Sequence, residues 1–357
     1  MPSVDSIRDA IASFPDPETG RGIGAMGQII TIVVLDNEAH LTIGLSTHSM
    51  PIVDEFKDAI ASRISAAFPG VTTTIEIQKH SRPPARIGQV ALRAKSVILV
   101  GSGKGGVGKS TVAAGLALTL RRLGASVGLM DADVYGPSIP QLLGLSGRPS
   151  IDENKKIQPI LMQGEFPVMS MGFLIDKDQA VIWRGPMLHG SITQFLGDTN
   201  WGELDYLVID MPPGTGDIAL TLSQIVPVTG AVIVCTPQEV ALLDAVKAIS
   251  MFKKVNIPIL GMVENMSGFR CPGCGKNYDI FGSGGTRDKA EELAVPFLGK
   301  LPIDMTLRVA GDEGRLAEVI QQDDRARAPF DGIARAVVRG LAGKAAATPV
   351  RPQLPTL

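Results

Sequence analysis

The chain has 357 residues, with 34 lysines and arginines against 36 aspartates and glutamates, a formal net charge of −2. Its length suggests two domains at roughly 150 residues each, and the balanced charge argues against a broad nucleic-acid-binding surface. Hydrophobic content of 45% excludes wholesale disorder, and 3 cysteines are too few for a disulfide framework, so we expect a reducing compartment.

Residues 1–80 predict a small α+β domain. Helical spacing over residues 6–14 and 52–68 alternates with predicted strands over residues 29–35, 41–45 and 71–77. The N-terminus has neither the basic start nor the apolar stretch of a secretory signal, so we expect a cytoplasmic protein. Adjacent prolines at 83 and 84 predict a linker over residues 81–92.

Residues 93–343 predict an α/β domain with a mostly parallel sheet. Its apolar runs are continuous, which is typical of strands covered on both faces. They are residues 96–100, 127–130, 206–209, 231–235 and 259–263. The uncharged stretch 218–238 contains two prolines and predicts a helix, a turn and a strand rather than a membrane span. Residues 344–357, with three prolines, predict a disordered tail.

A phosphate-binding loop is predicted directly after the first of these strands. Residues 103–110 fit the pattern G-x-x-x-x-G-K-[ST] between a predicted strand and a predicted helix. Backbone N–H groups of such a loop cradle phosphates, with Lys109 on the β and γ phosphates and the Ser110 hydroxyl on magnesium. A glycine turn with a chance lysine is the alternative. The predicted nucleotide-binding residues are Gly103, Lys104, Gly105, Gly106, Val107, Gly108, Lys109, Ser110 and Thr111.

Carboxylates follow two of the predicted strands. Asp131 and Asp133 come after the second strand, where they can face the phosphates and orient an attacking water, or merely cap the following turn. Asp210 ends an apolar strand in the Walker B arrangement and is predicted to hold magnesium. The Pro- and Gly-rich residues 211–216 suit a switch loop, and Asp217 either belongs to it or caps the next helix.

Cys271 and Cys274 form a C-x-x-C motif on a Pro/Gly turn. The motif leaves zinc, an iron–sulfur cluster and redox exchange open. Tetrahedral zinc or a cubane cluster usually needs four ligands, whereas the remaining thiol, Cys235, lies in an apolar strand and is predicted to be a core residue. Two chains that each contribute the pair would complete a four-thiolate site on a twofold axis.

The phosphate loop resembles the deviant Walker A class of dimeric ATPases, which includes MinD, ParA and the nitrogenase iron protein, because Lys104 supplies a second lysine in K-G-G-x-G-K-[ST]. The resemblance implies that Lys104 reaches the partner's phosphates, that Asp133 activates water, and that Asn265 contacts the adenine ring. The lack of an N-K-x-D motif favours ATP over GTP. A solvated loop charge at Lys104 and an ordinary turn residue at Asn265 are the alternatives.

A broader set of motifs resembles the Mrp/ApbC family of iron–sulfur cluster carrier ATPases. These motifs are residues 103–111, 131–140, 183–187, 201–217 and 271–274. The resemblance implies a SIMIBI/MinD-like P-loop NTPase fold, a homodimer with a [4Fe–4S] cluster bridged by Cys271 and Cys274, and slow ATP hydrolysis with Mg²⁺. It also implies partners that donate the cluster and apoproteins that receive it.

The first domain resembles the MIP-eighteen type of iron–sulfur assembly module, on the strength of residues 16–18, 47–51 and 69–71. That module often carries a cysteine where this chain has Met50. We therefore expect target docking or a structural role for the domain rather than cluster binding.

Two other functions are compatible with a P-loop ATPase. A MinD/ParA-like positioning ATPase needs a membrane-binding amphipathic helix or a basic surface, and residues 352–355 supply neither, so we expect no membrane or nucleic-acid partner. A nucleotide-gated scaffold with a structural zinc site is the second alternative.

Overall fold

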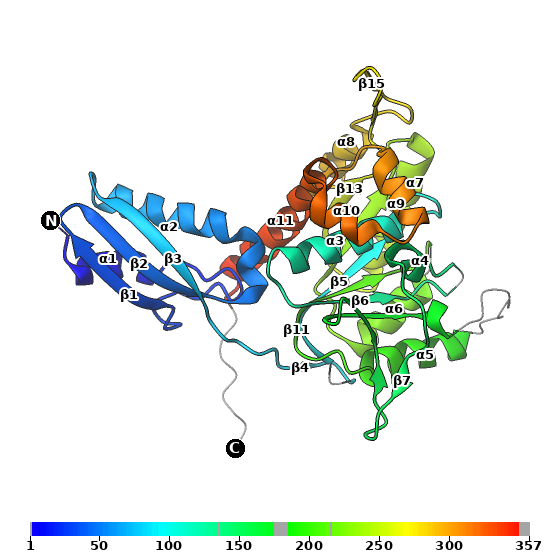
Figure 1. Cartoon of the computed structure of the whole chain (residues 1–357), viewed down its shortest axis with the longest axis horizontal. Coiled ribbons are helices and arrows are strands. Elements are labelled where there is room, and N and C mark those ends of the chain that lie inside the picture. The colour runs from blue at the N-terminus through cyan, green and yellow to red at the C-terminus, as the bar shows by residue number, and fades with distance from the viewer. Residues whose placement is uncertain (1, 91, 135, 175–184, 215, 350–357) are drawn as a thin grey trace. The chain divides into compact units, whose positions relative to one another are not determined.

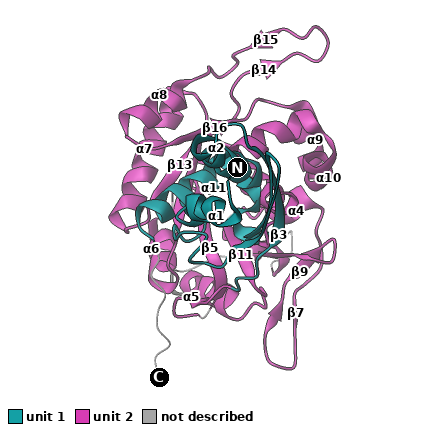
Figure 2. Cartoon of the chain, turned by 90° about the vertical axis from the view of Figure 1, so that its left-hand side faces the viewer, with its two compact units in different colours: residues 1–83, 335–357 teal, residues 84–334 magenta. Residues whose placement is uncertain are grey.

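The computed structural model describes residues 2–90, 92–134, 136–174, 185–214 and 216–349 (Figure 1). The chain divides into two compact units, residues 1–83 with 335–357 and residues 84–334 (Figure 2). Of the sequence motifs, Tyr135, Trp183, Arg184 and Thr215 lie outside the described residues.

The first unit is a three-stranded sheet packed against helices. Strand β1 (Ile29–Leu35) pairs antiparallel with β2 (Glu38–Leu45), which pairs parallel with β3 (Thr72–Lys79). Helices α1 (Val4–Ala12) and α2 (Val53–Ala67) bury their apolar faces in one core with β1 and β2. Alternate residues of β2 are buried, as expected for a sheet with one packed face. The predicted helices and strands of this region are confirmed.

Met50 lies in the short 3-10 helix η1 (Thr47–Ile52), half-buried and packed against the core of the first unit. Its side chain therefore contributes apolar packing where related modules often have a cysteine. This placement agrees with a structural role for the segment.

Helix α11 (Asp324–Ala347) contains the division between the units. Its residues from Arg335 onward belong to the first unit, where Arg335 and Arg339 lie 3.6 and 3.5 Å from Asp54 and Glu55 of α2. Residues 344–347 of the expected disordered tail are helical, because α11 continues through them. Residues 350–357 of that tail lie outside the described residues.

The second unit contains a sheet of nine strands in the order β16-β13-β12-β5-β11-β6-β10-β9, with β4 paired to β5. Only β4 and β9 pair antiparallel among the described strands of this sheet. The strands are β4 (Arg86–Ile87), β5 (Leu92–Gly101), β6 (Val127–Asp131), β9 (Ile160–Met162), β10 (Phe166–Ser170), β11 (Leu204–Asp210), β12 (Gly230–Cys235), β13 (Ile259–Glu264) and β16 (Phe297–Lys300). The predicted mostly parallel α/β sheet is confirmed.

Helices cover both faces of this sheet. In β5, Val97 and Leu99 share a core with helices α5, α6 and α7, whereas the equally buried Ile98 and Val100 alternate to the other face. Helix α3 packs on β5, β6 and β11. The helices of the unit are α3 (Lys109–Arg122), α4 (Ile139–Leu143), α5 (Gly185–Gly197), α6 (Gly216–Ile225), α7 (Glu239–Lys254), α8 (Gly285–Glu292), α9 (Met305–Asp312) and α10 (Leu316–Gln322).

The structure contains strands that the sequence analysis did not predict, among them the short strands β7 (Ser150–Ile151), β8 (Ile157–Gln158) and β9. The linker predicted over residues 81–92 contains β4, which forms a short antiparallel pair with the start of β5. Strands β10 and β16 were not predicted, because β10 contains Pro167 and β16 is a four-residue strand interrupted by Gly299. The stretch 218–238 divides into α6 and β12, and no helix in the described part of the chain is long and apolar enough to cross a membrane.

Candidate functional site

The carboxyl ends of five strands meet at one edge of the sheet. Asp210 at the end of β11 lies opposite Val100 of β5 and Asp131 of β6. Cys235 at the end of β12 lies opposite Glu264 of β13. Ligands of α/β proteins bind outside this edge, so the sheet places these side chains where a ligand would lie.

The predicted phosphate loop connects β5 to α3 at this edge. Gly106 and Gly108 both have φ of +78°, a left-handed conformation that favours glycine. A Cβ on Gly103 would lie 2.2 Å from the backbone of Asp244, so this position has no room for a side chain. The loop borders a cavity of about 290 Å³, whose further lining includes Asp133 and Pro213.

Lys109, the first residue of α3, gathers the predicted site residues around its ammonium group. Its Nζ lies 2.5 Å from Oδ1 of Asp210, 3.7 Å from Oδ2 of Asp133 and 3.2 Å from the Ser110 hydroxyl. Lys109 and Asp210 are both buried. Because Coulomb attraction is strong where water is excluded, this lysine compensates the charges of two carboxylates.

Asp131 has a different role from Asp133. Its Oδ1 accepts a hydrogen bond from the Asp133 N–H at 3.0 Å, and its Oδ2 accepts from the Ile139 N–H and the Ser170 hydroxyl at 3.2 and 3.0 Å. The carboxyl group therefore fixes the loop that carries Asp133, which favours the turn-capping interpretation for Asp131. Burial, and then the charge of Asp210, raise the pKa of Asp131 to about 8.

Asp210 retains an oxygen for a further ligand. Burial raises its pKa, and the Lys109 charge opposes that rise. Its Oδ2 is buried without a hydrogen-bond partner in the described part of the chain. Mg²⁺ takes oxygen ligands and usually binds proteins through one or two side chains plus waters and phosphates. The free carboxylate oxygen and the nearby Ser110 hydroxyl therefore fit a magnesium ion.

Asn265 follows β13 and lies against the phosphate loop. Its Nδ2 donates to the backbone carbonyl of Val107 at 2.8 Å, and its backbone N–H donates to the carbonyl of Cys235 at 2.8 Å. A Cβ on Gly108 would lie 2.2 Å from this Nδ2. The side chain thus joins the end of β13 to the loop, and its contact with adenine stays a prediction.

Glu264 is a buried carboxylate that sequence analysis did not single out. It accepts hydrogen bonds from the Ser267 hydroxyl at 2.5 Å and from the N–H groups of Gly284 and Thr286 at 2.9 Å. Burial raises its pKa, but these hydrogen bonds outweigh it and hold the pKa below its ordinary value. Its position at the end of an apolar strand, as for Asp210, was the available signal.

The predicted cysteine pair lies on a hairpin formed by β14 (Phe269–Arg270) and β15 (Asn277–Tyr278). Cys271 is half-buried and Cys274 is exposed. The N–H groups of Cys274 and Gly273, with the Cys274 thiol, lower the pKa of Cys271. Among the described residues, no three His, Cys, Asp or Glu side chains are grouped so as to hold a metal ion.

Cys235 lies in the buried strand β12, as expected for a core thiol. Its Sγ is 3.3 Å from the Thr286 hydroxyl. Burial raises the pKa of Cys235 to about 11. A thiol in this environment stays protonated at neutral pH and is a poor metal ligand.

The base of the cysteine hairpin is joined to the phosphate loop through a short stretch of backbone. After Asn265, the Ser267 N–H donates to the Leu301 carbonyl at 2.9 Å, and the Ile303 N–H donates to the Gly268 carbonyl at 2.8 Å. Cys271 lies three residues after Gly268 in the chain. The two predicted sites are therefore linked by hydrogen-bonded backbone.

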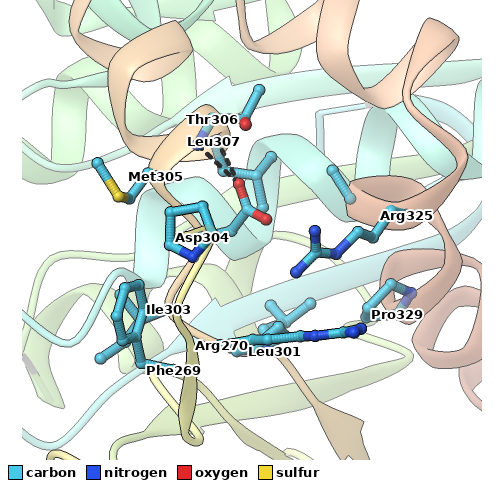
Figure 3. A pocket seen from close by; sticks show the side chains of 13 residues that line it. Phe269, Arg270, Leu301, Ile303, Asp304, Met305, Thr306, Leu307, Arg325 and Pro329 are labelled. Atoms are coloured by element: carbon cyan, nitrogen blue, oxygen red, sulfur yellow. Dashed lines mark hydrogen bonds between the residues drawn. The ribbon is translucent and has the colours of Figure 1, made fainter. Parts of the chain in front are cut away.

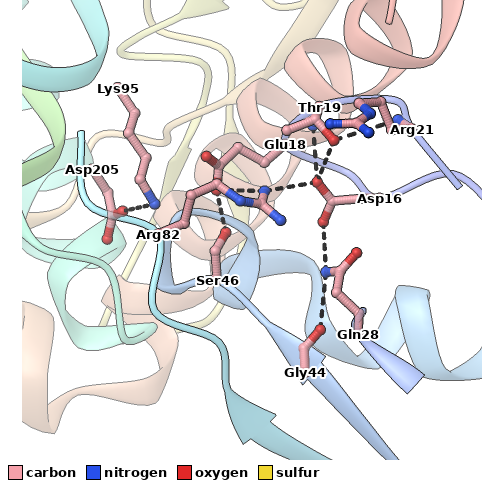
Figure 4. Close-up of polar contacts among 10 residues, drawn as sticks. All are labelled: Asp16, Glu18, Thr19, Arg21, Gln28, Gly44, Ser46, Arg82, Lys95 and Asp205. Atoms are coloured by element: carbon pink, nitrogen blue, oxygen red, sulfur yellow. Dashed lines mark hydrogen bonds and ion pairs between the residues drawn. The ribbon is translucent and has the colours of Figure 1, made fainter. Parts of the chain in front are cut away.

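The Asp16-Pro17-Glu18 motif of the first unit forms a buried polar cluster (Figure 4). Asp16 accepts from the Thr19 N–H, Gln28 Nε2 and Arg82 Nη1 at 3.0, 2.9 and 2.8 Å. Burial raises the pKa of Asp16, but the charge of Arg82 and the hydrogen bonds together outweigh burial. The pKa of Asp16 therefore lies below its ordinary value. The motif thus fixes the start of the expected linker. Lys95 and Asp205 of the second unit form a separate ion pair of 3.0 Å.

Comparison with protein families decides the assignment. Residues 93–338 match the family model described as the NUBPL iron-transfer P-loop NTPase, and residues 5–77 match the one described as iron-sulfur cluster assembly protein. The chain belongs to the NUBPL iron-transfer P-loop NTPase family. The resemblance to iron–sulfur carrier ATPases with an N-terminal assembly module is thereby confirmed.

Two relatives of this NUBPL-family chain match almost its full length, and a third matches about two thirds of it. A Deinococcus radiodurans protein named iron-sulfur cluster carrier protein is 44% identical over 341 residues, which is 95% of each chain. A protein of the same name from Synechocystis sp. is 42% identical and spans 96% of this chain and 98% of its own. The Mus musculus iron-sulfur cluster transfer protein NUBPL is 48% identical over 249 residues, 69% of this chain and 78% of its own.

Solved structures support the fold of this NUBPL-family member. A nucleotide-binding protein from Archaeoglobus fulgidus, in complex with ADP, is 44% identical with a TM-score of 0.56, covering 63% of this chain and 88% of that one. The Pyrococcus furiosus cell division ATPase MinD is 22% identical with a TM-score of 0.51, covering 68% of this chain and 98% of that one. The predicted MinD-like P-loop NTPase fold is confirmed.

Proposed function

We propose that the protein is an ATP-dependent iron–sulfur cluster carrier that works as a homodimer in the cytoplasm. One observation carries the proposal: a pair of accessible thiols, Cys271 and Cys274, lies on a hairpin whose base is hydrogen-bonded to the phosphate loop through Asn265. A cluster donor would load the site, and apoproteins would receive the [4Fe–4S] cluster from it. The names of the full-length relatives support this assignment.

The nucleotide site is proposed to bind ATP with Mg²⁺. Lys109 would exchange its contacts with Asp210 and Asp133 for the β and γ phosphates, which frees both carboxylates. Asp210 and Ser110 would then hold Mg²⁺, which neutralises phosphate charge when bound. Asp133 would orient the attacking water, and the amide of Asn265 would contact the adenine ring. Slow hydrolysis is expected.

The cargo site requires two chains. One chain offers two accessible thiols, and a [4Fe–4S] cluster takes four thiolates. A twofold axis through the hairpins would bring both pairs to one cluster. Coupling to ATP follows if ATP has different affinities for two dimer geometries, because a ligand shifts an equilibrium only through differential binding.

Lys104 tests the proposed dimeric ATPase. Its side chain is only half-buried in the phosphate loop, and its backbone carbonyl accepts the Ser102 hydroxyl at 2.9 Å. Because its proposed target is the partner's phosphates, Lys104→Ala should lower ATP turnover at least about a hundredfold while unfolding and ATP binding stay unchanged. Phosphate release measures turnover, calorimetric titration measures ATP binding, and urea denaturation measures the free energy of unfolding. Unchanged turnover would remove the cross-dimer role.

Anaerobic reconstitution of the full chain with iron and sulfide tests the carrier function. We expect broad visible absorbance, about four iron atoms per two chains, and a dimer in sedimentation. Stoichiometric zinc without visible absorbance would instead favour the scaffold with a structural zinc site. Binding to anionic vesicles or DNA in the ATP state, without a cluster, would favour the positioning ATPase.

A further inference from the structure

A small cavity lies beside the cysteine hairpin, within the second unit (Figure 3). Its volume is about 100 Å³. Hairpin residues Phe269, Arg270 and Pro272 form one wall, residues 301–307 form another, and Arg325 lies at the start of α11. We call it the hairpin pocket. A cavity of this size can admit side chains but not a folded element.

The hairpin pocket is fixed in position relative to the predicted cluster ligands. Arg270 and Pro272 are the two chain neighbours of Cys271, so whatever fills the pocket lies next to that thiol. Its other wall is tied to the hairpin base by the hydrogen bonds of Leu301 with Ser267 and of Ile303 with Gly268. A bound group would therefore be held on the same backbone as the cysteine pair.

Two exposed arginines give the pocket its charge. Neither Arg270 nor Arg325 has a hydrogen bond or ion pair through its guanidinium group within the described ranges, whereas Arg308 nearby pairs with Asp312 at 2.7 Å. The pocket also contains the carboxylate of Asp304, whose Oδ1 accepts from the first turn of α9 at 2.8 and 3.0 Å. Asp304 thus serves as the N-cap of α9, and its single negative charge leaves the two arginines in excess, so the pocket carries a net positive charge.

We propose that the hairpin pocket docks the recipient protein by a carboxylate side chain next to an apolar one. Arginine is suited to this role because its planar fork binds carboxylates with two charge-assisted hydrogen bonds. Leu301, Ile303 and Pro329 offer apolar surface for the neighbouring side chain. The inference rests on the proposed carrier function and names the chemistry by which a recipient is recognised.

Cluster transfer requires that the recipient protein bind close to Cys271. In transfer, an iron–Cys271 bond breaks as an iron–thiolate bond to the recipient forms, and the released thiolate takes the proton of the incoming thiol, with no change of oxidation state. The recipient's cysteines must therefore come within bonding distance of the cluster. The hairpin pocket is lined by Arg270 and Pro272, the residues on both sides of Cys271, and so lies where a recipient would have to bind.

Peptide binding to the metal-free full chain tests the proposal. The probe is a fluorescein-labelled peptide of sequence Gly-Leu-Asp-Glu-Leu-Gly, and its control carries Asn-Gln in place of Asp-Glu. Fluorescence anisotropy should show the acidic peptide binding about tenfold more tightly than the amide peptide. Arg325→Glu and Arg270→Glu should each remove that preference, while Arg308→Glu, an arginine already paired on α9, should retain it.

Transfer provides the second measurement. Arg325→Glu should slow reactivation of apo-aconitase by the loaded carrier about tenfold, with iron content, ATP turnover and sedimentation unchanged. Equal peptide affinities in Arg325→Glu and the wild type would overturn the proposal, as would unchanged transfer. Loss of the dimer in Arg325→Glu would assign the pocket to a second copy of the chain instead. The peptide assay uses protein without a cluster, so its result does not depend on whether reconstitution succeeds. Failure of the pocket proposal and failure of the carrier proposal can therefore be distinguished.

Discussion

Replacing Lys109 by methionine is expected to lower ATP turnover about a thousandfold or more, because the variant loses the cation that stabilises charge on the transferred phosphate. The loss should appear in the rate of phosphate release at saturating ATP. Methionine retains the length and apolar stem of the side chain, so the change isolates the ammonium group. Turnover within tenfold of the wild type would contradict the assignment.

The same substitution should destabilise the nucleotide-free protein. Removing one partner of a buried ion pair typically costs about 3–5 kcal/mol, and Lys109→Met leaves Asp210 and Asp133 without their common cation. Burial already raises the pKa of Asp210, and without the lysine it should rise further. When the pKa of a carboxyl group is higher in the folded than in the unfolded protein, the free energy of unfolding falls as pH rises from the unfolded pKa to the folded one. Urea denaturation should therefore show a deficit that grows as pH rises above the ordinary pKa of an aspartate, about 4.

Lys95→Met is the matched control for this experiment. Lys95 and Asp205 form a buried ion pair of 3.0 Å between β5 and β11, away from the phosphate loop. The control should lose stability without losing turnover per folded molecule. Loss of turnover in both variants would show that the effect of Lys109→Met is general unfolding.

The phosphate loop could be predicted from the sequence because its chemistry is local. Consecutive residues supply the glycine conformations, the lysine and the hydroxyl, and the apolar runs before Asp131 and Asp210 predict strands whose ends meet at one edge. Parallel order then brings the carboxylates to Lys109. The residues that form this site are recognisable from consecutive sequence, and the fold places them together. Individual site residues could therefore be predicted.

Other features depend on segments far apart in the chain. The hydrogen bond of Asn265 with Val107 joins residues separated by most of the unit, and the Glu264 network needs the start of α8. The hairpin pocket combines residues 269–272, 301–307 and 325–329. None of these contacts has a local sequence signal. The grouping of the last part of α11 with the first unit is likewise a matter of tertiary contacts.

Removing both accessible thiols is expected to abolish cluster binding. In Cys271→Ala/Cys274→Ala, iron and sulfide content after anaerobic reconstitution should fall to background, because no thiolate of the proposed site remains. Cys274 is exposed and Cys271 half-buried, so the free energy of unfolding should change by no more than about 0.5 kcal/mol. ATP binding should be retained, since neither thiol borders the phosphate loop cavity.

Cys235→Ala is the control, because it removes a thiol without removing a proposed ligand. The buried Cys235, with its pKa raised to about 11, should not contribute to the cluster, and this variant should reconstitute like the wild type. The single variant Cys271→Ala separates a half-site from a complete site: if two chains share one cluster, it leaves two thiolates per dimer and should lose both the cluster and cluster-dependent dimerisation. A single variant that retains a full cluster on one chain would contradict the bridging arrangement.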